Sequence, residues 1–199
     1  MSALPPKSPP DFHAPWEVVG RREVYACPPW ISLELQQVRL PDGRLVDDYH
    51  RIVLPDYSVM FIETDDGRIV VERQYKHGVG AVTLTLPGGL VAAGEDPLVG
   101  AQRELLEETG YVAEDWRSLG SYVQNSNYAG SRGHLYAAKR ARRVCEPQSG
   151  DLENIEILLM TRADLLAAVR RNEIQVTSFV AAIALATHSD ISSVSTPSR

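Results

Sequence analysis

The stretch 86-LPGGLVAAGEDPLVGAQRELLEETGY-111 decides how this chain is interpreted, because it joins a glycine-rich loop to an acidic, well-bounded helix. Asp96 is a favourable N-cap and Pro97 suits the first helical position. Gly110 suits the left-handed residue that follows many helices. The stretch therefore predicts a helix from about Pro97 to Thr109, preceded by a loop in which backbone can approach other groups closely.

Three glutamates fall in the second half of this helix: Glu104, Glu107 and Glu108. Like charges at this spacing repel, and the helix macrodipole already presents negative charge at that end; each effect costs on the order of a few tenths of a kcal/mol. A helical wheel places the acids in one sector and three leucines on the opposite side. Those leucines are Leu98, Leu105 and Leu106. The wheel thus predicts an exposed acidic face and a leucine-lined core side.

A divalent cation would turn this repulsion into attraction. Mg²⁺ and Mn²⁺ take hard oxygen ligands, commonly one or two carboxylates together with substrate phosphates and water. An exposed carbonyl at Gly88 or Gly89 would supply a further oxygen ligand, and Arg103 lies one turn before Glu107 and can pair with it. The alternatives are a solvated charged helix face and a plain Gly-Gly turn.

The spacing of the glycines, acids and arginine resembles the Nudix box. Seven positions match at fixed spacing: Gly89, Glu95, Arg103, Glu104, Glu107, Glu108 and Gly110. Tyr111 stands where the box asks for an aliphatic residue. The resemblance implies a Nudix hydrolase, an α/β/α sandwich with a mixed sheet that uses Mg²⁺ or Mn²⁺ to cleave a nucleoside diphosphate linked to another moiety.

The resemblance extends to the ADP-ribose and ADP-sugar pyrophosphatase branch through "RLPDGR", "VERQYKHGVG" and "RELLEETGY". In that branch a small N-terminal antiparallel sheet is exchanged between two subunits, so we expect a homodimer. The expected boundaries are a disordered arm over 1–15, the N-terminal β-region over 16–57, the catalytic domain over 58–187 and a disordered tail over 188–199.

The same resemblance implies roles for individual residues. The Gly88 carbonyl, Glu104, Glu107 and Glu108 would bind metal, and Glu95 would orient the helix. Glu153, in the loop "GDLENIEI", would accept the proton of the attacking water; the alternative base is Glu107.

Substrate contacts are also implied. Arg73 and Lys76 in "RQYK" would face the phosphates, with Arg51 a further candidate of the same kind. Trp30 and Tyr49 lie in the segment that stacks on the base in relatives; core or interface packing is the alternative for both aromatics.

The expected reaction is hydrolysis of an ADP-sugar such as ADP-ribose to AMP and ribose 5-phosphate. Thr85, where the branch often has glutamate, and Ser126 with Tyr128 depart from the ADP-ribose pattern. GDP-sugars and dinucleoside polyphosphates therefore stay open as substrates. A nucleotide-sugar sensor without turnover is a less favoured alternative, because the acid set is complete.

Composition excludes other classes of function. The formal net charge of −6 argues against a nucleic-acid surface. No apolar run is long enough to cross a bilayer, which argues against a membrane partner. Cys27 and Cys145 have no metal-ligand spacing, and we expect reduced thiols in a cytoplasmic protein; the alternative is a disulfide between them. The order of predicted elements, many strands with one central helix and two late helices, favours a sheet between helical layers.

Overall fold

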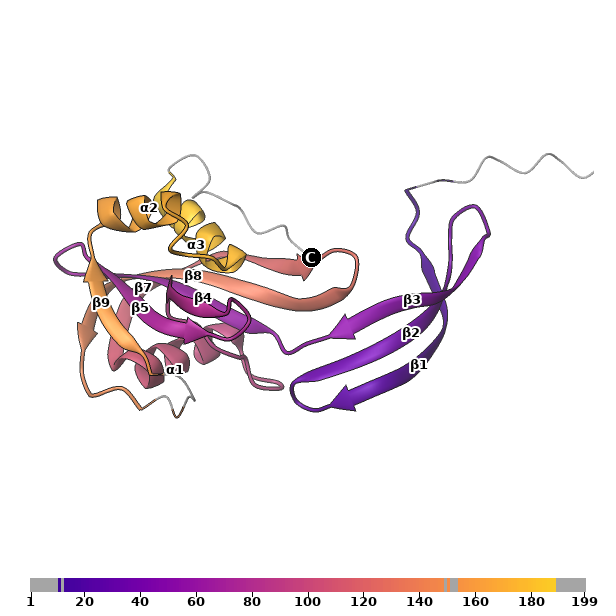
Figure 1. The fold of residues 1–199 in the computed structure, drawn as a ribbon, viewed down its shortest axis with the longest axis horizontal. Coiled ribbons are helices and arrows are strands. Elements are labelled where there is room, and N and C mark those ends of the chain that lie inside the picture. The colour runs from indigo at the N-terminus through magenta and orange to yellow at the C-terminus, as the bar shows by residue number, and fades with distance from the viewer. Residues whose placement is uncertain (1–10, 12, 149, 151–153, 189–199) are drawn as a thin grey trace, which may run out of the picture. The chain divides into compact units, whose positions relative to one another are not determined.

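The computed structural model describes residues 11, 13–148, 150 and 154–188. The chain divides into two compact units, Met1–Leu54 with Asn125–Gly130, and Pro55–Gln124 with Ser131–Arg199. Strands dominate both units (Figure 1). The glycine-rich loop and the acidic helix belong to the second unit, which therefore carries the candidate site.

The first unit is an antiparallel meander of three strands. They are β1 (Glu17–Cys27), β2 (Ile31–Arg39) and β3 (Leu45–Val53), with β2 in the middle. Gly43 sits in the predicted turn between β2 and β3 with φ 89°, a conformation that favours glycine. The end of β3 also meets Ala129 and Gly130 in a short parallel pairing. The small N-terminal antiparallel sheet that the sequence led us to expect is thus present.

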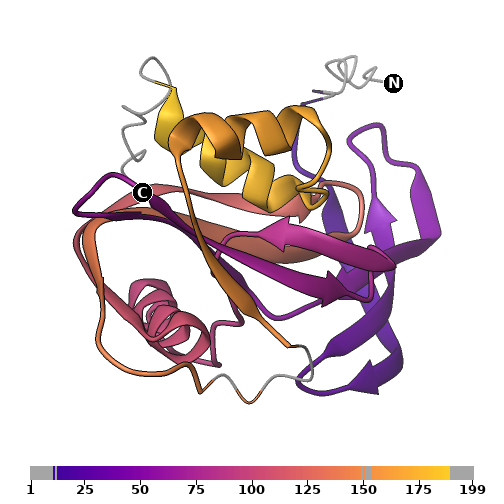
Figure 2. The ribbon, with the colours of Figure 1, turned by 60° about the vertical axis from the view of Figure 1, so that its left-hand side comes forward.

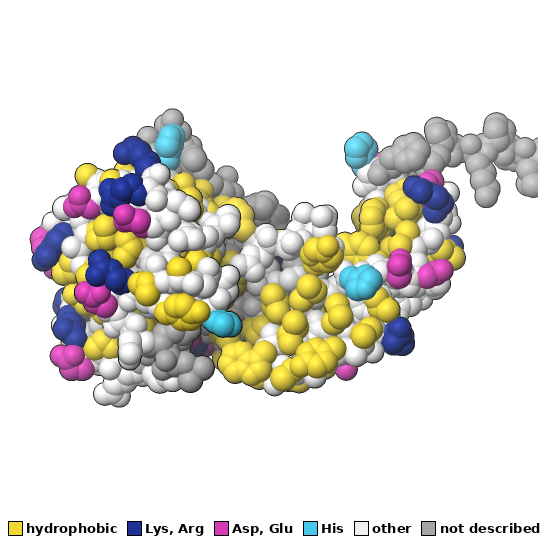
Figure 3. Space-filling model, in the orientation of Figure 1, with side chains coloured by type: hydrophobic (Ala, Val, Ile, Leu, Met, Phe, Trp, Pro, Cys, Tyr) yellow, Lys and Arg dark blue, Asp and Glu magenta, His cyan; other side chains and the backbone are white. Residues whose placement is uncertain are grey.

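The first unit exposes an unusual amount of apolar surface. Trp30 is 61% exposed and Tyr25 is 55% exposed. Figure 3 shows hydrophobic side chains gathered over these strands. The remaining large exposed apolar residues described in this unit are Trp16, Val18, Val24, Leu45 and Tyr128. Contiguous apolar surface of this kind commonly marks an interaction face.

The second unit holds the other strands and all three described helices. Its strands are β4 (Tyr57–Thr64), β5 (Ile69–Lys76), β6 (Ala81–Thr85), β7 (Tyr111–Asn125), β8 (Ala129–Arg143) and β9 (Glu156–Met160). Its helices are α1 (Pro97–Thr109), α2 (Arg162–Arg170) and α3 (Thr177–Thr187). β4 runs parallel to β8, whereas β5 pairs antiparallel with β6 and β9, so the sheet is mixed.

Helices cover both faces of this mixed sheet (Figure 2). Alternation along β4 explains the layers, since successive side chains point to opposite faces. Val59 and Phe61 pack in the core cluster that includes residues of α2 and α3. Met60 and Ile62 pack in the cluster that includes α1. The expected α/β/α sandwich with a mixed sheet is confirmed.

Two further observations concern the cysteines and the lengths of the helices. Cys27 and Cys145 are free thiols. None of the described helices combines the length and apolar character needed to cross a membrane.

Candidate active site on the acidic helix

The acidic helix begins and ends where its sequence predicts. Asp96 caps α1 by accepting hydrogen bonds from the amides of Leu98 at 2.8 Å and Val99 at 3.3 Å. Gly110 follows the helix in the left-handed region with φ 72°, and its amide donates to the Leu106 carbonyl. Both ends are thus set by local interactions, which holds the glutamates at a fixed register.

Arg103 organises the acidic side chains. Its Nε donates to Glu95 Oε1 at 3.0 Å and its Nη2 to Glu95 Oε2 at 3.0 Å. Its Nη1 donates to Glu104 Oε1 at 2.7 Å and to Glu107 Oε2 at 3.0 Å. Nη2 also reaches the Leu90 carbonyl at 3.1 Å, which ties the loop to the helix. The planar guanidinium therefore serves three carboxylates at once.

These contacts shift the ionisation of the group. The hydrogen bonds from Arg103 hold the pKa of Glu95 at about 2, with help from the Ala92 amide. The same carboxylates raise the pKa of Arg103, with Glu95 contributing most. Glu95 thus stays ionised and anchors Arg103.

Replacing Glu95 by Gln is expected to lower stability near neutral pH and to make unfolding less sensitive to acid. The folded pKa of about 2 lies below the usual 4.5. The stabilisation is therefore complete above about pH 4.5 and is lost as pH falls through about 2. Chemical denaturation of both proteins across that window checks this, with the exposed-site variant Glu146→Gln as control. A Glu95→Gln deficit that stays constant down to the acid end would contradict it.

The glycines of the loop make room for the acids. The Gly88 amide donates to Glu108 Oε2 at 2.9 Å. A Cβ on Gly88 would lie 2.5 Å from the Ser58 carbonyl oxygen, and a Cβ on Gly89 would overlap the Glu104 carboxylate. A side chain at Gly88 would therefore clash with backbone, and a side chain at Gly89 would displace the Glu104 carboxylate; a plain turn would have neither constraint.

Gly100 has a similar explanation. A Cβ there would lie 2.9 Å from Glu95 Oε2. Glycine in mid-helix costs roughly 1 kcal/mol relative to alanine. Glycine at this position leaves room for the Glu95 carboxylate beside the helix, where it reaches Arg103.

The predicted orientation of the helix is partly wrong. Glu108 is only 5% exposed, whereas Leu106 is 37% exposed. The helix turns Ala101, Leu105 and Glu108 toward the sheet, because the loop covers Glu108 and its Gly88 amide compensates the buried carboxylate. The acids therefore do not share one exposed face.

The donor set fits a divalent cation. Glu104, Glu107 and Glu108 offer only oxygen, the donor that Mg²⁺ and Mn²⁺ prefer. The loop backbone approaches the acids at two points: a Cβ on Gly89 would overlap the Glu104 carboxylate, and the Gly88 amide donates to Glu108. Among the residues that the structure describes, no three acidic, histidine or cysteine side chains converge closely enough to enclose an ion. Mg²⁺ needs no such cage when substrate phosphates and water complete its shell.

Comparison with known proteins agrees with this geometry. Residues 54–178 match the model of the NUDIX domain. The chain belongs to the Nudix family. Residues 16–56 match the nucleoside diphosphate sugar hydrolase N-terminal domain. The chain is therefore a Nudix pyrophosphohydrolase, and the Nudix fold and family expected from the box are confirmed. Nudix hydrolases generally use divalent metal ions.

Individual relatives of this Nudix hydrolase point the same way. The chain is 26% identical to the ADP-ribose pyrophosphatase of Bacillus subtilis (strain 168) over 72% of this chain and 78% of that protein. It is 30% identical to the methanol dehydrogenase activator of Bacillus methanolicus over 77% of this chain and 83% of that protein. A solved structure titled "Crystal structure of ADP compounds hydrolase" shares the fold, with a TM-score of 0.75 at 19% identity over 86% of this chain and 91% of that chain.

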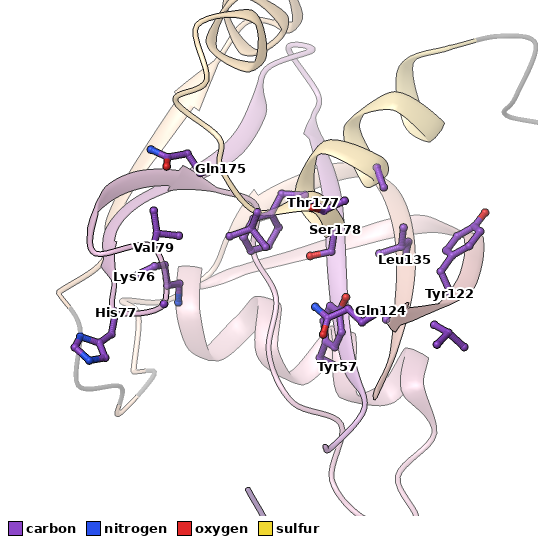
Figure 4. Close-up of a pocket in the computed structure, with 16 residues that line it drawn as sticks. Tyr57, Lys76, His77, Val79, Tyr122, Gln124, Leu135, Gln175, Thr177 and Ser178 are labelled. Carbon is purple, nitrogen blue, oxygen red and sulfur yellow. The ribbon is translucent and has the colours of Figure 1, made fainter. Parts of the chain in front are cut away.

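Arg73 and Lys76, the residues expected to contact substrate phosphates, line two different cavities of the Nudix domain. Arg73 forms an ion pair with Glu156 at 2.9 Å and lines a hollow of about 340 Å³ beside Asn172 and Glu173. Lys76 lines a different cavity of about 810 Å³ that contains no box residue. The two basic side chains thus line different hollows, and Figure 4 shows that of Lys76.

The other predicted substrate residues belong to the first unit. Arg51 forms an ion pair with Glu34 at 3.2 Å. The Tyr49 hydroxyl donates to the Asn127 carbonyl, and its ring lies edge-on to Trp16 at a centroid distance of 5.8 Å. Trp30 is exposed. Glu153, the expected base, lies outside the described residues.

A buried polar cluster near the Nudix loop was not foreseen. Glu72 is fully buried and accepts hydrogen bonds from Gln74 at 2.8 Å and from Thr85 at 3.2 Å. Glu72 and Thr85 face each other in the β5–β6 register, so a carboxylate reaches Thr85 from the neighbouring strand. The available signal was an acid directly after the apolar run Ile69–Val71 in a predicted strand.

Proposed function

We propose that this Nudix hydrolase cleaves the diphosphate of an ADP-sugar such as ADP-ribose, giving AMP and ribose 5-phosphate with Mg²⁺ or Mn²⁺ as cofactor. The observation that carries the proposal is the Arg103 network, which holds Glu95, Glu104 and Glu107 together while Gly88 holds Glu108. The relatives named as ADP-ribose pyrophosphatases support the choice of substrate.

The box residues act mainly by positioning. Glu104, Glu107 and Glu108 would hold the divalent ion, together with the Gly88 carbonyl. A bound ion would neutralise part of the diphosphate charge and lower the pKa of the attacking water. Phosphoryl transfer requires chiefly positioning and charge stabilisation, so a rigid network of carboxylates around one arginine suits it.

The remaining roles fall to residues outside the box. Glu153 accepts the proton of the attacking water, because a carboxylate near a water is a competent general base. Lys76 binds phosphate as a point charge, and Arg73 becomes available to phosphate when its exposed pair with Glu156 opens. That pair is half-exposed on both sides, which makes it weak in water.

A substrate panel tests the proposal. Purified protein is incubated with Mg²⁺ and, separately, ADP-ribose, a GDP-sugar and a dinucleoside polyphosphate, and the products are identified by chromatography. We expect the highest kcat/KM with ADP-ribose and the products AMP and ribose 5-phosphate. Preference for a dinucleoside polyphosphate, which Tyr128 would favour, would overturn the assignment.

Adding Mg²⁺ to metal-free protein is expected to raise its thermal unfolding temperature. An ion that binds only the folded state stabilises it by mass action, to about 2.7 kcal/mol at a free concentration 100 times Kd. Differential scanning fluorimetry over a Mg²⁺ series measures this, and Glu108→Gln should reduce the response. An equal rise in unfolding temperature in the unmodified protein and in Glu108→Gln would mean that the ion binds elsewhere.

The homodimer is proposed from the apolar surface of the first unit. Removing residues 1–15 should leave the oligomer unchanged, whereas removing 1–50 should give an aggregated or unfolded product, because β3 would lose its partners. Light scattering on the full chain and both truncations measures this. A stable, active monomer of the full chain would contradict the exchanged-sheet arrangement.

A further inference from the structure

Glu72 is a carboxylate buried within the sheet of the second unit. It lies in β5 and is 0% exposed, and its partners in the strand register are Thr85 on β6 and Ile157 on β9. A buried carboxylate is costly unless hydrogen bonds compensate its charge. Packing alone would therefore favour an apolar residue at this position.

Glu72 lies on the face of the sheet that α1 covers. Successive side chains of a strand point to opposite faces. On β5, Val71 packs in the cluster that includes α2 and α3, whereas Val70 packs in the cluster that includes α1. Glu72 follows Val70 by two residues and so shares its face. On β6, Leu84 packs on the α2–α3 side, which turns the adjacent Thr85 toward α1.

Three side chains on this face form a closed set of hydrogen bonds. Gln74 Nε2 donates to Glu72 Oε2 at 2.8 Å and to Thr85 Oγ1 at 3.0 Å. The Thr85 hydroxyl in turn donates to Glu72 Oε2 at 3.2 Å. All three residues are at most 3% exposed, and hydrogen bonds are electrostatically stronger in such surroundings than in water. Glu72 thus holds the side chain of Thr85 in one position.

The position of Thr85 is transmitted to the glycine-rich loop. Thr85 ends β6, and Gly88 follows it by only three residues. The Gly88 amide donates to Glu108 Oε2 at 2.9 Å. Leu86, which lies between Thr85 and Gly88, is 1% exposed, so this short segment has little room to shift by itself. A displaced Thr85 would therefore displace the amide that compensates Glu108.

The loop is also held along β4. The Pro87 and Gly89 carbonyls accept hydrogen bonds from β4 amides, each at 2.9 Å. The Gly88 amide, between them, is directed instead to Glu108. The bonds to β4 thus fix the path of the loop, while the approach of Gly88 to α1 also depends on where β6 delivers the chain.

We propose that Glu72 is a positioning residue of the Nudix site, which acts through Thr85 to set how closely the Gly88 amide meets Glu108. The hydrogen bond carries this role rather than the charge, because the hydroxyl of Thr85 is the link to the loop. The expected effects on Mg²⁺ binding and turnover rest on the metal site of the proposed function. The expected effect on the loop does not.

Hydrogen exchange over residues 86–91 in EDTA tests the loop without a metal ion. Thr85→Val removes the hydroxyl and should speed exchange there about tenfold relative to exchange in α2, the size of one lost hydrogen bond. Thr85→Ser keeps the hydroxyl and should retain slow exchange. Thr83→Val is the matched control, because the Thr83 hydroxyl, on the same strand, donates to the Glu173 carbonyl at 2.8 Å. It should leave exchange over 86–91 unchanged relative to α2.

Binding of Mg²⁺ alone, measured by calorimetry, and turnover of the best substrate extend the test. Thr85→Val should weaken Mg²⁺ binding and lower kcat about 10- to 100-fold, as a small misplacement of acting groups does. Glu72→Met should behave in the same way. Glu72→Gln keeps an oxygen that accepts the Thr85 hydroxyl and should stay close to the unmodified protein. If Thr85→Val does not fold, Thr85→Ala replaces it, because the smaller side chain leaves room for water beside Glu72.

Three results would overturn the positioning role. The first is unchanged exchange over 86–91 in both Thr85→Val and Glu72→Met. The second is faster exchange with unchanged Mg²⁺ affinity and kcat. The third is a greater loss of kcat in Glu72→Gln than in Thr85→Val, because the charge of Glu72 would then act directly. Faster exchange in Thr85→Val with no Mg²⁺ binding by the unmodified protein would instead refute the metal cofactor of the proposed function and leave the positioning of the loop standing.

Discussion

Replacing Glu108 by Gln is expected to lower turnover by several orders of magnitude while the protein stays folded. The Gln side chain keeps an oxygen that can accept the Gly88 amide, so the loop contact at 2.9 Å survives. The negative charge that would hold the divalent ion is lost, and positioning of the diphosphate is lost with it. Steady-state kinetics at saturating substrate and Mg²⁺ measures the effect.

The burial of Glu108 makes controls necessary. Glu146→Gln removes a carboxylate that is 84% exposed and should leave turnover unchanged. Circular dichroism and thermal unfolding establish that Glu108→Gln is folded. Near-normal turnover in a well-folded Glu108→Gln would show that Glu108 does not bind the metal ion.

Replacing Glu153 by Gln is expected to lower kcat strongly with a modest change in KM. The loss would appear chiefly in the transition state if this residue accepts the proton of the attacking water. Glu107→Gln provides the comparison, because Glu107 is the alternative base; its carboxylate accepts a hydrogen bond from Arg103 at 3.0 Å. Both variants are measured at saturating Mg²⁺.

The two variants separate the possible bases. A mild loss of kcat in Glu153→Gln with a severe loss of kcat in Glu107→Gln would identify Glu107 as the general base. Mild losses in both would mean that another group activates the water. The dependence of rate on Mg²⁺ concentration distinguishes a lost base from a weakened metal site, since only the latter is recovered by more ion.

Local signals in the chain predicted a large part of the fold. Asp96, Pro97 and Gly110 bounded α1 because capping depends on neighbours in sequence. In β7 and β8 the residue pattern by itself favours a strand only over 118–124 and 133–141. They extend further, over Tyr111–Asn125 and Ala129–Arg143, because each gains a paired neighbour in the sheet. Strand ends depend on such pairing, which one sequence does not reveal.

The candidate site was likewise predictable from the sequence only in part. The spacing of Arg103 and the box glutamates predicted that they act together, and the pair of Arg103 with Glu107 followed from helical geometry. The pair with Glu95 and the burial of Glu108 depend on where the loop folds back on the helix. A helical wheel takes no account of the segments that pack around the helix, so it placed Glu108 on the exposed side and Leu106 on the core side.

The sequence by itself determined the family, the bounds of the acidic helix and the residues of the box, because each depends on spacing along the chain. Only the tertiary structure decided which glutamate is buried, why Gly88, Gly89 and Gly100 have no side chain, and where Lys76 lies. Those features depend on contacts between segments distant in sequence: β4 against the loop, and the β5–β6 turn opposite α3. Such contacts form only when the chain packs, since burial and charge compensation are properties of the packed neighbours.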